Sequence, residues 1–406
     1  MRTLLLLFFL IAATASAADT ARLLRQINAG STSERIATLR ELAAADPATA
    51  VSTAIVWLQP GSDVALASAA ARVLWDLEQK AAPAEAALRA RLDDPNAEVA
   101  YPVVGALAVL GAPKADLRPT RLRLARAPDR FIAFYSARAL YPDSALGFED
   151  YLRANLGAIE LIGSGRPSNA FTRNELERDA NALLDQLAKQ GGRPGFDALM
   201  VAYPAQSPRV QNAIASALDA VPVQDGDPLR IARLLDDPQV SVRRSVTAAL
   251  ADYHEAASPV IGKILAGLQH PDADFRGATA GALGRLADTP PTNAEQARAS
   301  AWRTQVERTI APALALLATD DREVDVRKEA ADALQALGLW GGPALDIIAS
   351  RVTQEPDARV RHALVRVCWT ARYAPNLPLA LLRQLAENDP DPYVRNEAKS
   401  VLVAKR

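Results

Sequence analysis

The residues best suited to chemistry in this chain are three histidines and one cysteine. His254, His270 and His362 show neither the HxxxH nor the HExxH spacing that places two zinc ligands on one helix face. Cys368 is the only cysteine, so no disulfide can form within the chain and no Cys/His cluster exists. The sequence therefore predicts no catalytic residue, no metal site and no cofactor.

Acidic pairs recur at Asp93-Asp94, Asp236-Asp237 and Asp320-Asp321 and raise the question of calcium. Each pair stands where a helix is expected to begin, and a carboxylate there caps free backbone N–H groups. Helix capping is therefore favoured over Ca²⁺ binding. The polar segment Gly163-Ser164-Gly165-Arg166-Pro167 is interpreted as a loop, because no strand precedes it as a phosphate-binding loop would require.

Aromatic residues are scarce, but six of the sixteen Phe and Tyr fall within residues 131–151. The segment before them carries Arg121, Arg123 and Arg126. Aromatic and Arg side chains are enriched at interface hot spots, so these arginines with Tyr135 and Tyr141 form a candidate partner-binding site. The alternatives are that the rings fill a wider core and that the arginines complement helix C-termini.

A second candidate contact is Trp302, within an irregular stretch at about 287–306. Thr289-Pro-Pro-Thr292 opens this stretch, and a run with helical character follows. Two interpretations stay open: a projecting helix that meets a partner, or an extension of one repeat helix.

The elements that must position these residues form a repeat. Measured from Arg to Arg, the steps are 33, 51, 34 and 34 residues, the second being one repeat plus an insertion. Apolar residues follow each Arg at helical spacing, which predicts a helix that stacks on its neighbours. Cys368 takes the column of Leu250 and Leu334, which predicts a buried thiol. The dipeptides that set this frame are Val242-Arg243, Phe275-Arg276, Val326-Arg327, Val360-Arg361 and Val394-Arg395.

Upstream, the frame recurs without its Arg at Val99-Ala100 and Ile132-Ala133. Residues of about 141–205 match it poorly and have room for one or two degenerate units. Within a repeat, Asp-Pro predicts a helix start, and Gly338, Gly341, Gly342 and Pro343 predict a break between two helices. We predict one solenoid domain over 18–406.

The pattern Asp-Pro-x-x-x-Val-Arg followed by Ala-x-x-Ala-Leu resembles the HEAT repeat in its short-helix bacterial form. The resemblance implies an all-α, right-handed α-solenoid of helical hairpins. HEAT-like repeats also occur in bilin lyases, and one di-iron hydroxylase of this class binds metal through several His-Glu pairs, whereas this chain has only His254-Glu255.

In HEAT arrays, shared Asp and Arg residues form a ladder that ties each repeat to the next. The resemblance carries this structural role to one set of positions, with His270 replacing the acid at one rung. The positions are Asp237, Arg243, Arg276, Asp321, Arg327, Arg361, Asp389 and Arg395.

The N-terminus has the layout of a secretory signal. Arg2 precedes an apolar run of about ten residues, which is too short to span a bilayer. Ala15-Ser16-Ala17 then forms a cleavage site before Ala18. We expect residues 1–17 to be removed and the mature protein to be periplasmic or secreted. The net charge of −1 indicates no nucleic-acid partner, and no later segment reads as a membrane span.

These observations predict an exported, non-enzymatic HEAT-repeat scaffold or accessory subunit that binds another protein. Two alternatives remain. The chain could be a secreted enzyme or the non-catalytic appendage of one, either bilin-lyase-like or associated with a hydrolase. It could also bind carbohydrate or cell wall, in which case exposed aromatics are expected within 131–151.

Overall fold

The structure is a computed structural model that describes residues 18–164, 170–287 and 296–404. Every regular element in these ranges is a helix, and none of the described residues forms a strand. The predicted all-α class is thus confirmed. The expected signal segment 1–17 lies outside the described residues. None of the described helices is long and apolar enough to cross a bilayer.

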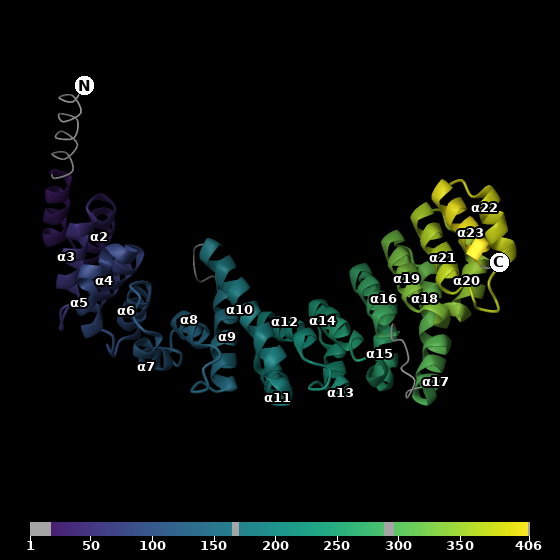
Figure 1. The fold of residues 1–406 in the computed structure, drawn as a ribbon, viewed down its shortest axis with the longest axis horizontal. Helices are drawn as coiled ribbons and strands as arrows, with labels where there is room; N and C mark the ends of the chain where they lie inside the picture. Colours follow the sequence, from purple (N-terminus) through teal and green to yellow (C-terminus); the bar gives the residue numbers. More distant parts are fainter. Residues whose placement is uncertain (1–17, 165–169, 288–295, 405–406) are drawn as a thin grey trace, which may run out of the picture. The chain divides into compact units, whose positions relative to one another are not determined.

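The chain divides into two compact units, Met1–Leu183 and Leu184–Arg406, and the boundary falls inside α10 (Ala170–Gln190). Each unit is a stack of antiparallel helical hairpins, whose order along the chain can be followed in Figure 1. The predicted solenoid of stacked hairpins is confirmed at this level. That residues 18–406 form one continuous domain stays a prediction.

The first unit begins with a helix over residues 18–29. In the hairpins that follow, the first helices pack on one another from repeat to repeat. These first helices are α2 (Thr32–Ala45), α4 (Val64–Asp76), α6 (Ala97–Val109) and α8 (Arg130–Leu140). Their hairpin partners are α3 (Pro47–Trp57), η1 (Glu78–Ala84) with α5 (Glu85–Ala90), α7 (Lys114–Leu124) and α9 (Phe148–Gly163).

In the second unit, the first helices again form one row, each packed on the next. This first row consists of α12 (Pro208–Ala217), α14 (Val240–Ala251), α16 (Ala273–Ala287), α19 (Val324–Ala336), α21 (Ala358–Thr370) and α23 (Pro392–Ala404).

The second row is more irregular, since several of its helices are short and joined to 3-10 turns. It consists of α11 (Gly192–Ala202), α13 (Pro228–Ile231) with η4 (Ala232–Asp236), η5 (His254–Val260) with α15 (Ile261–Ala266), α18 (Ala311–Asp320), η8 (Gly338–Ala344) with α20 (Leu345–Arg351), and α22 (Leu379–Asn388). The short turns η2 (Tyr203–Ala205), η3 (Leu218–Ala220), η6 (Gly267–Gln269) and η9 (Val352–Gln354) complete the unit.

The repeat frame places the apolar positions in the core between the rows. Val326, Ala330 and Leu334 of α19 are all buried, as the helical spacing predicts. The Cys368 thiol is also buried, and burial raises its pKa to about 12. The predicted burial of Cys368 is therefore confirmed, and its low reactivity stays a prediction. The predicted break after α19 is present too, because Gly338 has a φ of +54° that favours glycine.

Helix starts differ in detail from the expected Asp-Pro caps. The carboxylates of Asp321 and Asp389 accept the backbone N–H two residues on, from Glu323 and Asp391, and so lie before the helix rather than at its N-cap. Asp391 provides the cap of α23 instead, accepting from the N–H of Val394. The acid at this position thus orders the loop before the helix, and its two oxygens also accept from the arginine of the preceding repeat.

The irregular segments resolve into long helices. The degenerate middle holds α9, of 16 residues, and α10, of 21 residues, where other repeats have shorter helices. Of the stretch at about 287–306, residues 288–295 lie outside the described residues. The rest forms α17 (Gln296–Gln305), which continues through a π-helical turn, η7 (Val306–Ile310), directly into α18. This geometry matches the expected extension of a repeat helix.

Candidate functional site

Three guanidinium groups in the second unit tie each repeat to the next through bidentate ion pairs. Nε and Nη2 of Arg276 donate to Asp321 at 2.7 and 2.8 Å. Arg327 binds Glu355 at 2.7 and 2.9 Å, and Arg361 binds Asp389 at 2.9 Å through both nitrogens. We call each of these pairs a rung.

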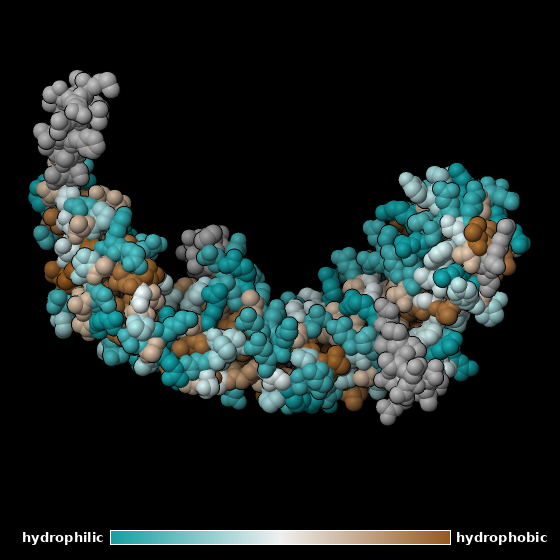
Figure 2. Space-filling model, in the orientation of Figure 1, coloured by the Kyte–Doolittle hydropathy of each residue, from teal (hydrophilic) through white to brown (hydrophobic). Residues whose placement is uncertain are grey.

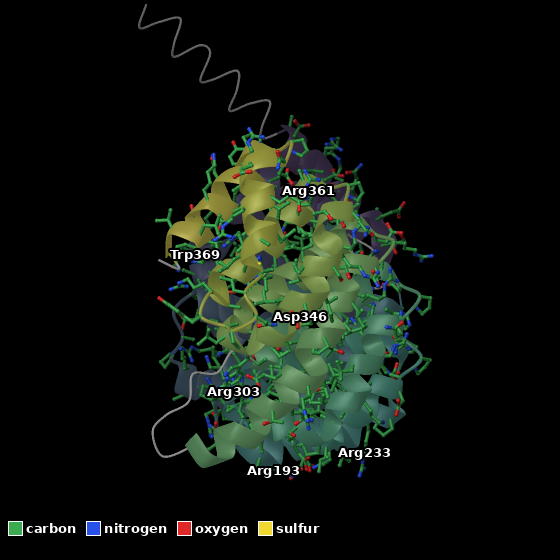
Figure 3. The ribbon with its side chains drawn as sticks, turned by 90° about the vertical axis from the view of Figure 1, so that its right-hand side faces the viewer. Arg193, Arg233, Arg303, Asp346, Arg361 and Trp369 are labelled. Atoms are coloured by element: carbon green, nitrogen blue, oxygen red, sulfur yellow. The ribbon has the colours of Figure 1, made fainter. Side chains whose placement is uncertain are left out.

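Each rung also holds the loop of its own repeat. Nη1 of Arg327 donates to the Asp321 carbonyl at 2.8 Å, and Nη1 of Arg361 to the Pro356 carbonyl at 2.9 Å. Figure 3 shows Arg361 among the helices of the C-terminal repeats. The side chains of all three pairs are less than a tenth exposed. Because these charges lie away from water, their mutual hydrogen bonds must compensate the lost hydration.

Electrostatics at the rungs favours the ionised carboxylates. Burial alone would raise the pKa of Asp389, but hydrogen bonds from Arg361 and the Asp391 N–H, together with the Arg361 charge, outweigh it and lower that pKa. The same balance lowers the pKa of Asp321. The acid at these positions is therefore charged at neutral pH.

The ladder positions at the two ends behave differently. Among the described residues, no arginine donates a hydrogen bond to the Asp237 carboxylate. Its Oδ2 accepts from the Tyr203 hydroxyl at 2.6 Å instead. Arg395 belongs to the last helix and donates to the Asp389 and Pro390 carbonyls of its own loop. Arg243 faces His270 at 2.8 Å, where the other rungs have an acid.

A groove of about 540 Å³ lies on the first row, over α16 and between α14 and α19. Its floor is made of Gly277, Ala278, Gly281 and Gly284. A Cβ on Gly281 would meet nothing within 4 Å, so this glycine opens the groove without being needed for packing. By contrast, a Cβ on Gly284 would lie 3.0 Å from Ala333 of α19, so the close approach of these two helices requires a glycine there.

The walls of this groove carry opposite charges. Arg244 of α14 lines one wall. Arg285 of α16 lies on the same side, because it donates a hydrogen bond to the Ala248 carbonyl of α14 at 3.4 Å. Glu329 and Asp332 line the α19 side. Burial, and after it the charges of neighbouring acids, raises the pKa of Glu329. In Figure 2, hydrophilic residues dominate the visible first-row side of the second unit.

The predicted arginine cluster of the first unit is only partly available. Arg126 is bound by Asp150 at 2.6 Å, and the side chain of Arg121 is half-buried beside Tyr101, where burial lowers its pKa. Arg123 is exposed. The three arginines thus share one helix end but not one open surface.

The predicted aromatics pack mainly on each other. Tyr135 lies 4.7 Å from Phe131 and 5.1 Å from Phe134, between ring centroids. Phe131 continues the cluster to Tyr101, and Tyr141 meets Tyr151 edge to face at 5.1 Å. Tyr135 and Tyr141 are partly exposed, but their ring contacts lie within the α8–α9 hairpin, and only the Phe131–Tyr101 contact reaches the preceding repeat.

Trp302 differs from its expected role as a surface contact, because it is only 3% exposed. It lies on α17, and the last residue of that helix, Gln305, hydrogen-bonds Ser258 of the preceding repeat. Since a buried ring cannot meet a partner without rearrangement, we interpret Trp302 as an anchor of the extended helix.

Two features were missed from the sequence. Glu355 completes a rung, and its six-residue spacing to Arg361 could have shown it, because Asp321 stands six residues before Arg327 and Asp389 six before Arg395. The other is an exposed cluster at the end of α21, where the Arg372 guanidinium lies 5.0 Å from the Trp369 ring and 4.7 Å from the Tyr373 ring. Trp369 lies at the edge of the repeats in Figure 3.

Comparison with known proteins identifies the architecture. No family model and no curated protein matches the chain. The karyopherin Kap121p bound to the extreme C-terminus of the protein phosphatase Cdc14p is similar, with a TM-score of 0.52 and 13% identity over 96% of this chain and 46% of that one. The fold is a helical solenoid of the HEAT/ARM type. Kap121p bound to Pho4p gives a TM-score of 0.51 and 13% identity over 96% of this chain and 45% of that one.

This chain therefore spans less than half the length of the karyopherin chains that it matches. Because the identity to the karyopherins is only 13%, the similarity establishes the fold of this chain and nothing further. The finer resemblance to bilin lyases stays a prediction.

Proposed function

We propose that this chain is a non-enzymatic scaffold that binds a protein segment in the groove over α16. The observation that carries the proposal is the groove itself, which is open at Gly281 and has arginines on one side and, on the other, Glu329 and the Lys328-paired Asp332. Such a surface suits a peptide that carries charges of both signs along its two edges. Karyopherin structures of the same fold are described as bound to protein partners, which supports the class of ligand.

The second row gives no comparable surface. Several of its basic residues are engaged by acids of neighbouring repeats, as in Lys263 with Asp236 at 2.6 Å and Arg351 with Asp320, whereas Arg233 and Arg383 are exposed. Exposed pairs of this kind add little to stability but neutralise a cationic strip. We therefore place the partner on the first row and propose no nucleic-acid partner.

The experiment compares the same substitution at two glycines. One lies in the groove and the other outside it, and both have open space around the added side chain. Gly281→Leu fills the groove floor, whereas Gly262→Leu adds the same side chain to α15, where a Cβ also meets nothing within 4 Å. Both variants should fold. Affinity capture from the cell envelope with quantitative mass spectrometry should recover a protein on the wild type and on Gly262→Leu, and lose it on Gly281→Leu. Equal capture by both variants would overturn this assignment of the site.

The other predicted functions have less support. Among the described residues, no group of three His, Cys, Asp or Glu side chains is arranged to hold a metal ion. The rings of the 131–151 segment contact one another, and a sugar would need a free ring face. We therefore propose neither an enzyme nor a carbohydrate-binding module.

We further propose that the scaffold acts outside the cytoplasm, as a periplasmic or secreted protein. The support is the signal-like layout of residues 1–17, with its small residues before Ala18.

A further inference from the structure

The ladder is interrupted at the rung between α14 and α16. In the three regular rungs, Nε and Nη2 of the arginine both donate to one carboxylate. At this rung His270 takes the acid's place, and only Nη2 of Arg243 faces it, at 2.8 Å. Nε of Arg243 is buried and finds no acceptor among the described residues. Leaving a buried N–H of a charged group unpaired is costly.

The hydrogen bonds of His270 make the mismatch sharper. The regular acids accept the backbone N–H two residues on, and Nδ1 of His270 does the same with the Asp272 N–H at 3.1 Å. Nε2 faces the Arg243 N–H at 2.8 Å as well, and a neutral ring accepts at only one of its two nitrogens, so His270 cannot satisfy both donors. Nη1 of Arg243 is satisfied by the Asp237 carbonyl, but Nη2 and the ring cannot both be satisfied by each other and the Asp272 N–H, and Nε has no acceptor among the described residues. This rung lacks the anion that the other rungs supply.

A pocket of about 350 Å³ opens at this point. Arg243 and His270 form its polar end, with the Lys263–Asp236 pair at the rim. The rest of the lining is largely apolar and includes Leu235, Ile264, Ala266 and Phe275. The Phe275 ring is buried, and it lies 4.9 Å from the His270 ring and 5.6 Å from the Arg243 guanidinium, so it holds both groups in place.

The geometry points to a binding site for a small organic carboxylate in this pocket. The carboxylate accepts from Nη2 of Arg243 and from Nε2–H of His270, which together form the polar end of the pocket. A short apolar body lies against Leu235 and Ile264. Of the cations that line the pocket, Lys263 is paired with Asp236, whereas Arg243 has no carboxylate partner among the described residues, which suits a monoanion. This site is separate from the groove over α16 and does not depend on the proposed scaffold function.

The test uses the full mature chain and benzoate as the probe, with chloride at equal ionic strength as the control. Benzoate should raise the melting temperature of the wild type saturably, because a ligand that binds only the folded state stabilises it. His270→Asp supplies the missing acid from within the chain. This variant should melt higher than the wild type without ligand and bind benzoate at least about tenfold more weakly. Arg243→Gln should also lose the response.

Two further probes distinguish the source of the carboxylate. A short apolar peptide with a free C-terminus is compared with its C-terminal amide. Binding of the acid but not the amide identifies a protein C-terminus as the ligand, whereas binding of benzoate alone identifies a free small acid. Either result supports the site. The site would be overturned if no carboxylate raised the melting temperature saturably, or if benzoate raised it equally in the wild type and His270→Asp. The comparison with His270→Asp can be made even if Arg243→Gln fails to fold.

Discussion

At the residue scale, the rungs couple neighbouring repeats through charges that water barely reaches. Arg327 donates to the Glu355 carboxylate of the next repeat and to two adjacent carbonyls of its own loop, so a single side chain ties that loop to the next repeat. A buried ion pair adds little compared with a well-packed apolar pair, but removing one partner leaves a buried charge uncompensated. The rungs therefore matter most when they are broken.

Arg327→Ala should lower the free energy of unfolding by about 3 kcal/mol, because the buried Glu355 carboxylate loses both guanidinium bonds. Chemical denaturation followed by circular dichroism measures the change. Arg322→Ala is the matched control, since that neighbouring side chain is 72% exposed, and it should cost under about 0.5 kcal/mol. Equal effects of the two variants would contradict a structural role for the rung.

Acid should remove the contribution of these rungs. The pKa of Asp389 is lowered in the folded state, so its rung stabilises the protein fully at pH values above the ordinary Asp pKa of about 3.9. The stabilisation is lost as the pH falls through the lower folded-state pKa. The difference in unfolding free energy between the wild type and Asp389→Asn should therefore be constant from pH 7 to 5 and shrink below pH 4. A difference independent of pH would show that Asp389 is not ionised in the rung.

At the element scale, the first row was largely predictable and the second row was not. The spacing of Val326, Ala330 and Leu334 sets the first-row helices, because apolar side chains recur on one face at every repeat. Second-row helices contain prolines and glycines, as in η8, and their short 3-10 turns depend on packing against neighbours rather than on local preference. Trp302 was misplaced for the same reason, since its burial depends on how α17 joins α18.

The groove could not be predicted from α16 alone. Its glycines read as weak helix formers until the distances to α14 and α19 are known. Gly284 is required by the close approach of Ala333, whereas Gly281 faces open space. One helix therefore uses the same residue type for two purposes, and only the neighbouring repeats distinguish them.

These two glycines should respond oppositely to the same substitution. Gly281→Ala should raise the free energy of unfolding by about 0.5–1 kcal/mol, since alanine is the better helix former and its Cβ meets nothing. Gly284→Ala should lower it by about 1–3 kcal/mol, because the added Cβ pushes α16 away from α19. Thermal and chemical denaturation of both variants checks the pair. Stabilisation by Gly284→Ala would mean that the two helices do not approach as closely as the structure has them.

At the scale of the whole molecule, stability arises from nearest-neighbour stacking, because no hairpin buries enough surface by itself. With a single buried cysteine and no possible intrachain disulfide, the chain depends on this packing and on the rungs. That dependence bears on the proposed export, since disulfides form and persist in the oxidising compartments outside the cytoplasm. Here the regular rungs of the second unit supply cross-links between repeats without oxidation.

The proposed export gives the last prediction. The chain expressed with residues 1–17 should be recovered from the periplasm or the medium, starting at Ala18 and lighter by the mass of those seventeen residues. Intact-mass spectrometry and N-terminal sequencing of each cell fraction measure this. Ala17→Arg should block cleavage, because signal peptidase needs a small residue there, and the uncleaved chain should stay with the membrane. A variant lacking residues 2–17 should remain in the cytoplasm. If the full-length mass is found in the cytoplasmic fraction of the wild type, export is wrong and the capture experiment belongs in cytoplasmic extract instead of the envelope.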